Sequence, residues 1–66
     1  MAIHKVIEVI SQSKDGWEDA ARQAVKDASK TVKNIRAIDV DHLSGIVEKN
    51  KIVQYRVNAK ITFEVS

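Results

Sequence analysis

Apolar and polar residues alternate over residues 51–65, and this pattern constrains the fold more than any other feature of the chain. The apolar series is Val53, Tyr55, Val57, Ala59, Ile61, Phe63 and Val65. Polar residues stand between its members, and Ile52 is the one apolar interruption of that second series. A period of two over this length predicts a β-strand with one core face and one wetter face. The pattern also fixes the register, because a slip by one residue would turn every side chain over.

Two further strands are predicted over residues 3–10 and 35–48. In the first, Ile3, Ile7 and Val9 share one face, and Val6 and Ile10 share the other. Apolar residues on both faces are typical of a strand that is covered twice. A chain with one helix cannot supply both covers, so we expect the second cover to come from another copy.

Residues 16–33 predict one amphipathic helix. Its apolar stripe, at spacings of three and four, consists of Trp17, Ala20, Ala21, Ala24, Val25, Ala28 and Val32. Asp15 with Glu18 three residues later fits an acidic capping box, and Gly16 is the alternative cap. Asn34 suits a left-handed terminator. The stripe is mainly alanine, so a sheet can approach this helix closely.

The order strand–helix–strand–strand predicts an α+β domain over residues 1–66, with a three-stranded antiparallel sheet wrapped around one helix. Residues 48–51 predict a tight turn, with Asn50 best suited to a left-handed backbone. A helix of this length covers about 27 Å at ~1.5 Å per residue. The last strand is about 50 Å long at ~3.3 Å per residue, so the hairpin overhangs the helix by roughly 20 Å. Apolar residues on the overhang need a neighbour.

Composition narrows the function classes. A chain of 66 residues has a thin core, and it contains no cysteine, so neither disulfides nor a Cys/His zinc site can reinforce it. Oligomerisation is the remaining expectation. Acidic and basic residues are interspersed at a net charge of +2, which disfavours a nucleic-acid partner. No run approaches the ~20 apolar residues of a membrane span, and we expect a cytoplasmic protein.

Several segments together resemble the dodecin family. They are Lys5-Val6-Ile7-Glu8, Ser13, Trp17-Glu18-Asp19-Ala20, the run from Ala28 to Arg36, Tyr55-Arg56-Val57 and Ile61-Thr62-Phe63. The resemblance implies a hollow shell of twelve identical subunits with cubic symmetry. Many members bind flavins in pairs at subunit contacts and store or sequester them, without catalysing a reaction. In those members a tryptophan early in the second strand stacks on the flavin ring, and a glutamine after the tyrosine of the last strand hydrogen-bonds its polar edge.

This sequence departs from the family pattern at both flavin positions. Ala37 stands where the resemblance places the tryptophan, and Arg56 stands where it places the glutamine. Aromatic stacking on a base is worth about 1–3 kcal/mol, so its loss predicts weak or absent affinity for FMN or riboflavin. Arginine donates hydrogen bonds but cannot accept the ring N–H, whereas glutamine does both.

Polar residues next to these positions are further candidates for ligand binding. Asp39 and Asp41 are expected on the strand face of Ala37, and Gln54 and Arg56 on the polar face of the next strand. Pairing of Arg56 with either aspartate would fix the register or an interface, and would make assembly sensitive to acid. Alternatively, these groups fill the former flavin site or bind something small and charged.

Asp39 and Asp41 are also the candidate metal ligands, because calcium prefers carboxylate oxygens. The pattern around them is not an EF-hand loop, which requires a ligand and a glycine where Leu43 and Ser44 stand. Some dodecins without flavin are associated with calcium, so a calcium-stabilised structural assembly with no organic ligand is the alternative function.

No catalytic constellation is predicted. His4 and His42 lack a carboxylate or serine at a recognisable catalytic spacing, and no nucleophile elbow is present. Trp17 belongs to the apolar stripe of the helix, which favours an anchoring role over a cofactor platform.

Overall fold

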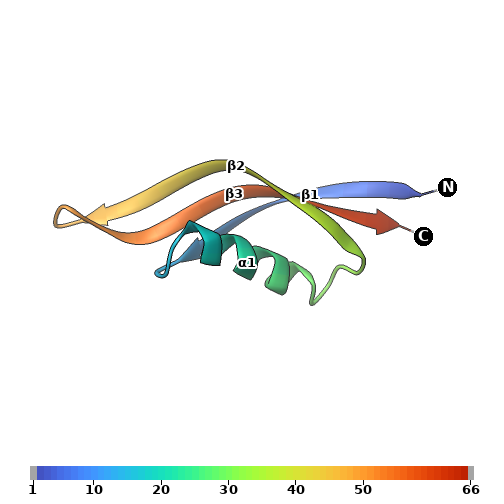
Figure 1. Ribbon diagram of the computed structural model, residues 1–66, viewed down its shortest axis with the longest axis horizontal. Coiled ribbons are helices and arrows are strands. Elements are labelled where there is room, and N and C mark those ends of the chain that lie inside the picture. The colour runs from blue at the N-terminus through green and yellow to red at the C-terminus, as the bar shows by residue number, and fades with distance from the viewer. Residues whose placement is uncertain (1, 66) are drawn as a thin grey trace.

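The computed structural model describes residues 2–65 (Figure 1). Its elements are strand β1 (Ile3–Ser13), helix α1 (Trp17–Ala28), strand β2 (Ile35–Glu48) and strand β3 (Lys51–Val65). The strands form one sheet in the order β1-β3-β2, and both strand pairs are antiparallel. The helix packs on one face of this curved sheet. The predicted α+β fold, with three antiparallel strands wrapped around one helix, is confirmed.

The core lies between α1 and the middle of β3. The buried hydrophobic residues within residues 2–65 are Ala20, Ala24, Val57, Ala59 and Ile61. The last three are consecutive members of the alternating apolar series, so the predicted inward face of β3 is confirmed. Because three of the five are alanines, helix and sheet pack closely but bury little apolar area.

Strand β1 continues three residues beyond its predicted end at Ile10. Ser11, Gln12 and Ser13 pair with Val57, Arg56 and Tyr55 of β3. The apolar residues of β1 lie on both faces, as predicted. Val6 and Ile10, on the face away from α1, are 55% and 65% exposed.

Helix α1 ends at Ala28, five residues before the predicted end. The N–H groups of Lys30 and Thr31 donate to carbonyl groups three residues back, which tightens the chain into a turn. The Ser29 hydroxyl adds a hydrogen bond to the carbonyl of Lys26 at 2.6 Å, a local bond that competes with helix continuation. The resulting helix has 12 residues. No helix described in residues 2–65 is long and apolar enough to cross a membrane.

The capping box predicted at Asp15 is wrong, because the helix begins with a different cap residue. Gly16, the alternative, is the cap residue, and its φ of 131° suits glycine. The backbone of Asp15 is already engaged, because its N–H donates to the Ser13 hydroxyl at 2.9 Å. That hydroxyl donates in turn to Asp19 Oδ2 at 2.5 Å. Ser13 thereby fastens the end of β1 to the first turn of α1.

Left-handed backbone occurs at three non-glycine residues within residues 2–65. Lys49 and Asn50 have φ values of 51° and 66° and form the two-residue turn between β2 and β3. This geometry matches a type I′ hairpin turn, and the prediction for Asn50 is confirmed. Asn34 is also left-handed, with φ 63°, but it lies immediately before β2 instead of ending the helix. Its carbonyl accepts the N–H of Glu64 at 3.0 Å.

Three bulges bend β2 against β3. The register shifts lie between Ile35 and Ala37, between Val40 and His42, and between Ile46 and Val47. Bulges increase the local twist and re-aim side chains. They account for the curved path of the hairpin around α1 (Figure 1).

The third bulge explains the one interruption of the polar series. Val53 is skipped in the pairing, so Val47 lies opposite Ile52. Ile52 thereby turns to the face of the sheet that carries Gly45 and Tyr55. A Cβ added at Gly45 would lie 3.3 Å from Ile52 Cγ2.

The β2–β3 hairpin extends well beyond the beginning of α1 (Figure 1). The molecule measures 52 × 20 × 13 Å. Val47 and Ile52 on this overhang are 60% and 46% exposed, and Leu43, which lies beside the beginning of α1, is 60% exposed. The predicted overhang with uncovered apolar residues is therefore confirmed.

Candidate functional site

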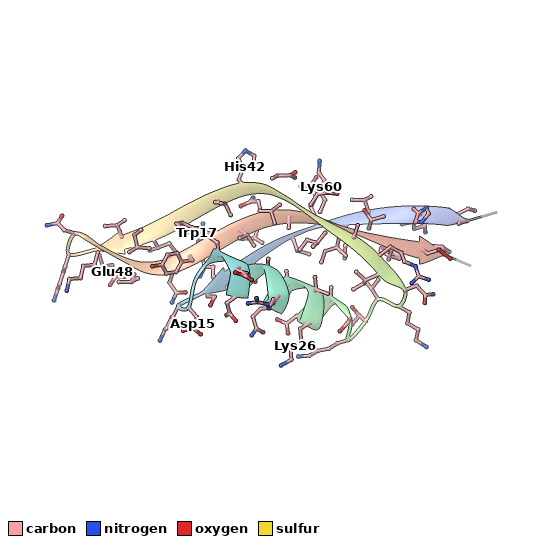
Figure 2. All side chains as sticks on the ribbon, viewed as in Figure 1. Asp15, Trp17, Lys26, His42, Glu48 and Lys60 are labelled. Carbon is pink, nitrogen blue, oxygen red and sulfur yellow. The ribbon has the colours of Figure 1, made fainter. Side chains whose placement is uncertain are left out.

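The predicted ligand residues lie on the outer face of the sheet, which is the face turned away from α1. This outer face comprises Ala37, Asp39, His42 and Ser44 of β2, the even-numbered residues 54–64 of β3 and the even-numbered residues 4–12 of β1. Of the intervening β3 residues, Val57, Ala59 and Ile61 are buried beneath α1. Figure 2 shows His42 and Lys60 standing on the side of the sheet away from the helix.

Ala37 and Arg56, the two positions predicted for a flavin site, lie far apart in one chain. Ala37 is paired with Thr62, and Arg56 lies six residues further back along β3. At ~3.4 Å per residue, this separation is about 20 Å. A ring system that touches both positions must therefore contact more than one copy of the chain.

Arg56 makes its contacts with β1, not with β2. Its Nε and Nη2 atoms both donate to Gln12 Oε1, at 2.7 Å and 2.5 Å. On the other side, Arg56 lies opposite Ser44. The predicted ion pair between Arg56 and Asp39 or Asp41 is therefore wrong, because the register places both aspartates further along β3. The intrachain reason for acid-sensitive assembly disappears with it.

Asp41 instead pairs with Lys60. It is the extra residue of the second bulge, and its Oδ2 lies 3.8 Å from Lys60 Nζ. Asp39 and Glu8 are the residues directly opposite Lys60 on the two neighbouring strands. One ammonium group therefore lies among three carboxylate residues in the middle of the outer face.

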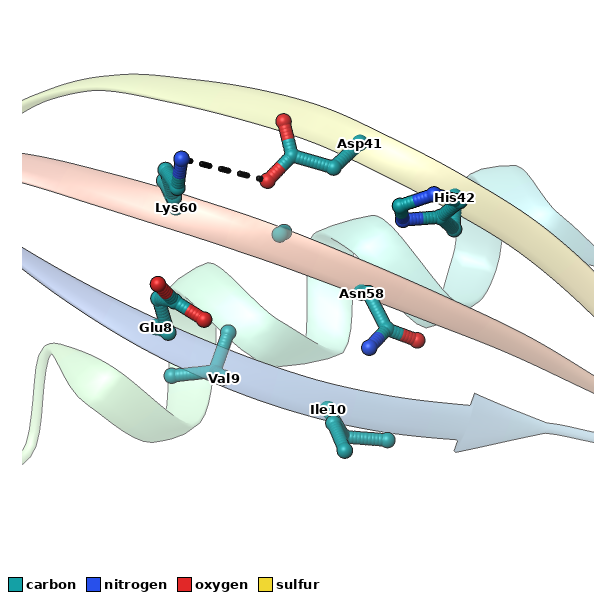
Figure 3. Close-up of a pocket in the computed structure, with 8 residues that line it drawn as sticks. Glu8, Val9, Ile10, Asp41, His42, Asn58 and Lys60 are labelled. Atoms are coloured by element: carbon teal, nitrogen blue, oxygen red, sulfur yellow. Dashed lines mark ion pairs between the residues drawn. The ribbon is translucent and has the colours of Figure 1, made fainter.

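A shallow groove of about 340 Å³ lies beside this ion pair (Figure 3). Its lining residues are Glu8, Val9, Ile10, Asp41, His42, Asn58, Ala59 and Lys60. No group of three or more His, Cys, Asp or Glu residues is placed to hold a metal ion within residues 2–65. Asp39 and Asp41 therefore do not form a metal centre within one chain.

The aromatic residues hold α1 to the hairpin. The Trp17 indole N–H donates to the carbonyl of Ser44 at 2.9 Å. The Trp17 and Tyr55 rings meet edge to face, with centroids 4.7 Å apart. These contacts confirm the anchoring role predicted for Trp17. His4 lies at the far end of the sheet, where its Nε2 is 4.0 Å from Glu64 Oε1.

Comparison with known proteins identifies the family. The sequence matches the family model named Dodecin over residues 3–66. The chain belongs to the dodecin family. It is 32% identical over 65 residues to the calcium dodecin of Mycobacterium tuberculosis (strain ATCC 25618 / H37Rv), and the match spans 98% of this chain and 92% of that protein.

Solved dodecins have the same fold. The dodecin of Streptomyces coelicolor superposes with a TM-score of 0.94 at 29% identity, over 98% of this chain and 93% of that one. The calcium dodecin of Mycobacterium tuberculosis, described as a calcium-chelating antigen with a novel calcium-binding site, superposes with a TM-score of 0.84. It is 31% identical, and the match covers 97% of this chain and 91% of that one. The family resemblance inferred from the sequence is confirmed.

In this dodecin, the predicted site residues lie on the outer face of the sheet, but they do not form one cluster of contacting side chains. The assignment of Ala37, Asp39, Gln54 and Arg56 to ligand binding, and of Asp39 and Asp41 to metal binding, stays a prediction. Three neighbours were missed at the sequence level: Glu8, Gln12 and Lys60. The even position of Gln12 in β1 could have identified it, but the strand was predicted to end at residue 10 and so left Gln12 out.

Proposed function

We propose that this dodecin is a non-catalytic, cytoplasmic, homo-oligomeric shell of twelve subunits that binds and buffers a small ligand. The mismatch between core and surface carries the proposal. Within residues 2–65, five hydrophobic residues are buried, whereas seven large ones are 43–65% exposed. A chain this short without disulfides gains the missing burial by association. The partners are copies of the same chain, not nucleic acid or a membrane.

The distribution of exposed residues favours a closed shell over a dimer. Ile3 and Val6 are exposed towards one end of the sheet, whereas Val47 and Ile52 are exposed on the hairpin at the other end of the molecule. A single two-fold contact covers one self-complementary patch. Two distant patches require at least two kinds of contact, which closed assemblies of higher symmetry provide.

Calcium is the ligand that we favour. Two observations support it: one relative of this chain, the protein from Mycobacterium tuberculosis, is named calcium dodecin, and Asp39 and Asp41 are two residues apart on β2. Calcium takes about six to eight oxygen ligands, more than these two residues offer. We propose that carboxylates of neighbouring subunits complete the site.

Flavin is the alternative ligand. The exposed Ala37 leaves the position of the stacking ring open, and FMN or riboflavin would have to bind without that stacking partner. We therefore propose weak flavin affinity at most for the natural sequence.

A calcium titration tests the proposed ligand. Protein stripped with EDTA is titrated with calcium chloride by calorimetry, and its thermal unfolding is followed in parallel. We expect saturable binding and a calcium-dependent rise in Tm, because a ligand that binds only the folded state stabilises it. Asp39→Asn and Asp41→Asn should each lower the affinity for calcium at least about tenfold, as expected for the loss of a carboxylate ligand.

The matched control is Asp27→Asn on α1, where Asp27 Oδ1 lies 3.3 Å from Lys30 Nζ. It removes the same charge away from the outer face and should leave calcium affinity unchanged. A particle of assembled mass that shows neither heat of binding nor a Tm shift would contradict the calcium proposal while leaving the assembly intact.

A further inference from the structure

The guanidinium of Arg56 is held along one edge only. Its Nε and Nη2 atoms donate to the same oxygen, Gln12 Oε1, at 2.7 Å and 2.5 Å. A guanidinium has five N–H donors, so about three remain after these two bonds. They include both hydrogens of Nη1 and one of Nη2, which lie along the end of the side chain and form the fork that fits carboxylate or phosphate bidentately.

No carboxylate neutralises this guanidinium within residues 2–65, where the ion pairs involve other cations. The outer-face neighbours of Arg56 on β3 are Gln54 and Asn58, and its neighbours across the sheet are Gln12 and Ser44. All four are uncharged. The carboxylates of the middle of the face gather instead around Lys60, four residues along β3. Arg56 is also half-buried, so its charge is less screened than that of a free surface side chain.

We propose that Arg56, positioned by Gln12, binds an oxyanion on the outer face of the sheet. The ligand group is a carboxylate or phosphate that receives the Nη1 and Nη2 donors end-on. Gln12 is the positioning residue, because its amide oxygen orients the guanidinium without cancelling the charge. The site requires neither calcium nor flavin.

The oxyanion has two sources with the same chemistry. One is a small anion from solution, such as inorganic phosphate. The other is a carboxylate of a second copy, and Asp39 is suited to this role because it lies on the outer face and forms no ion pair within residues 2–65. Only this second source rests on the assembly proposed above.

Inorganic phosphate tests the first source. The Tm is measured against phosphate concentration, with sodium chloride at matched ionic strength as reference, since salt alone screens charges. Phosphate should raise the Tm of the natural protein. Arg56→Gln should lower the affinity for phosphate at least about tenfold, which corresponds to the loss of one charge-assisted hydrogen bond. Arg56→Lys should retain part of the effect, because it keeps the charge and loses the fork.

The positioning role of Gln12 is tested by a substitution that adds a negative charge and keeps the shape of the side chain. Gln12→Glu keeps an oxygen for the guanidinium but neutralises it, so phosphate should no longer raise the Tm. A merely structural glutamine would tolerate this change. Arg22→Gln is the matched control, because Arg22 is exposed on α1 and pairs with Glu18; its phosphate response should equal that of the natural protein.

The second source predicts a different pattern. Phosphate has no effect on the Tm, but Arg56→Gln and Asp39→Asn each raise the subunit concentration at which the particle dissociates by at least about tenfold. The charge exchange Arg56→Asp with Asp39→Arg restores assembly. The proposal is overturned if Arg56→Gln changes neither the phosphate response nor the dissociation concentration.

Discussion

Ala37 and Arg56 stand where the sequence resemblance predicts the stacking tryptophan and the hydrogen-bonding glutamine of a flavin site. Both lie on the expected strands and on the outer face of the sheet. Because about 20 Å separates them along the sheet, the two residues would act on different parts of any ligand site shared between copies. They are therefore separable experimentally.

Restoring both side chains should restore flavin affinity. The double variant Ala37→Trp with Arg56→Gln supplies the ring face and the donor–acceptor pair that the natural chain lacks. We expect its affinity for FMN to exceed that of the natural protein by roughly 10- to 100-fold, given about 1–3 kcal/mol for stacking. Quenching of FMN fluorescence measures this difference.

Trp added at an exposed position of α1, Lys26→Trp, controls for non-specific quenching and should give no gain. An assembled double variant that binds FMN no better than the natural protein would contradict the prediction that these two positions limit flavin affinity.

Contacts of single side chains were harder to predict than the faces on which they lie. Alternation correctly placed Asp39, Gln54 and Arg56 on one face. The bulge at Asp41 was not visible in the sequence, because no glycine or proline marks it. That extra residue turns Asp41 towards Lys60, and the unpredicted extension of β1 gives Arg56 its partner Gln12.

Among the elements, β2 and β3 follow their predicted bounds, whereas α1 is shorter than its apolar stripe. A long period-two pattern is compatible with few structures other than a strand, so local sequence was enough to predict the bounds of these strands. Residues 29–33 continue a plausible helical spacing, but Ile35 must reach its place opposite Phe63. The chain leaves the helix early to meet that tertiary constraint, which propensity does not contain.

The hairpin turn offers a stability test at this scale. Lys49 has a left-handed backbone, which glycine adopts without steric strain. Lys49→Gly should therefore raise the free energy of unfolding by about 0.5–1 kcal/mol, and Asn50→Ala should lower it by about 1 kcal/mol. Denaturant unfolding at one fixed subunit concentration measures both, because association contributes to apparent stability.

Lys51→Gly is the control for charge removal. Lys51 is the first residue of β3 and lies outside the set of left-handed residues, so glycine there should give no gain. Equal stabilisation by both glycine substitutions would contradict a strained turn.

At the scale of the whole molecule, the association of copies is inferred from the exposed apolar residues on a long hairpin. Val47 is 60% exposed on the overhang, and burying a valine fully is worth about 1.5–3 kcal/mol. Val47→Lys should therefore raise the subunit concentration for dissociation at least about tenfold. Thr31→Lys, at the exposed turn after α1, adds the same charge outside the overhang and should leave assembly unchanged.

The mass of the natural protein in dilute neutral solution tests the central claim most directly. Light scattering coupled to size-exclusion chromatography should give about 89 kDa, which is twelve subunits of 7.4 kDa each. A stable, folded species of 7.4 kDa would contradict the account, because the exposed apolar residues would then need no neighbour.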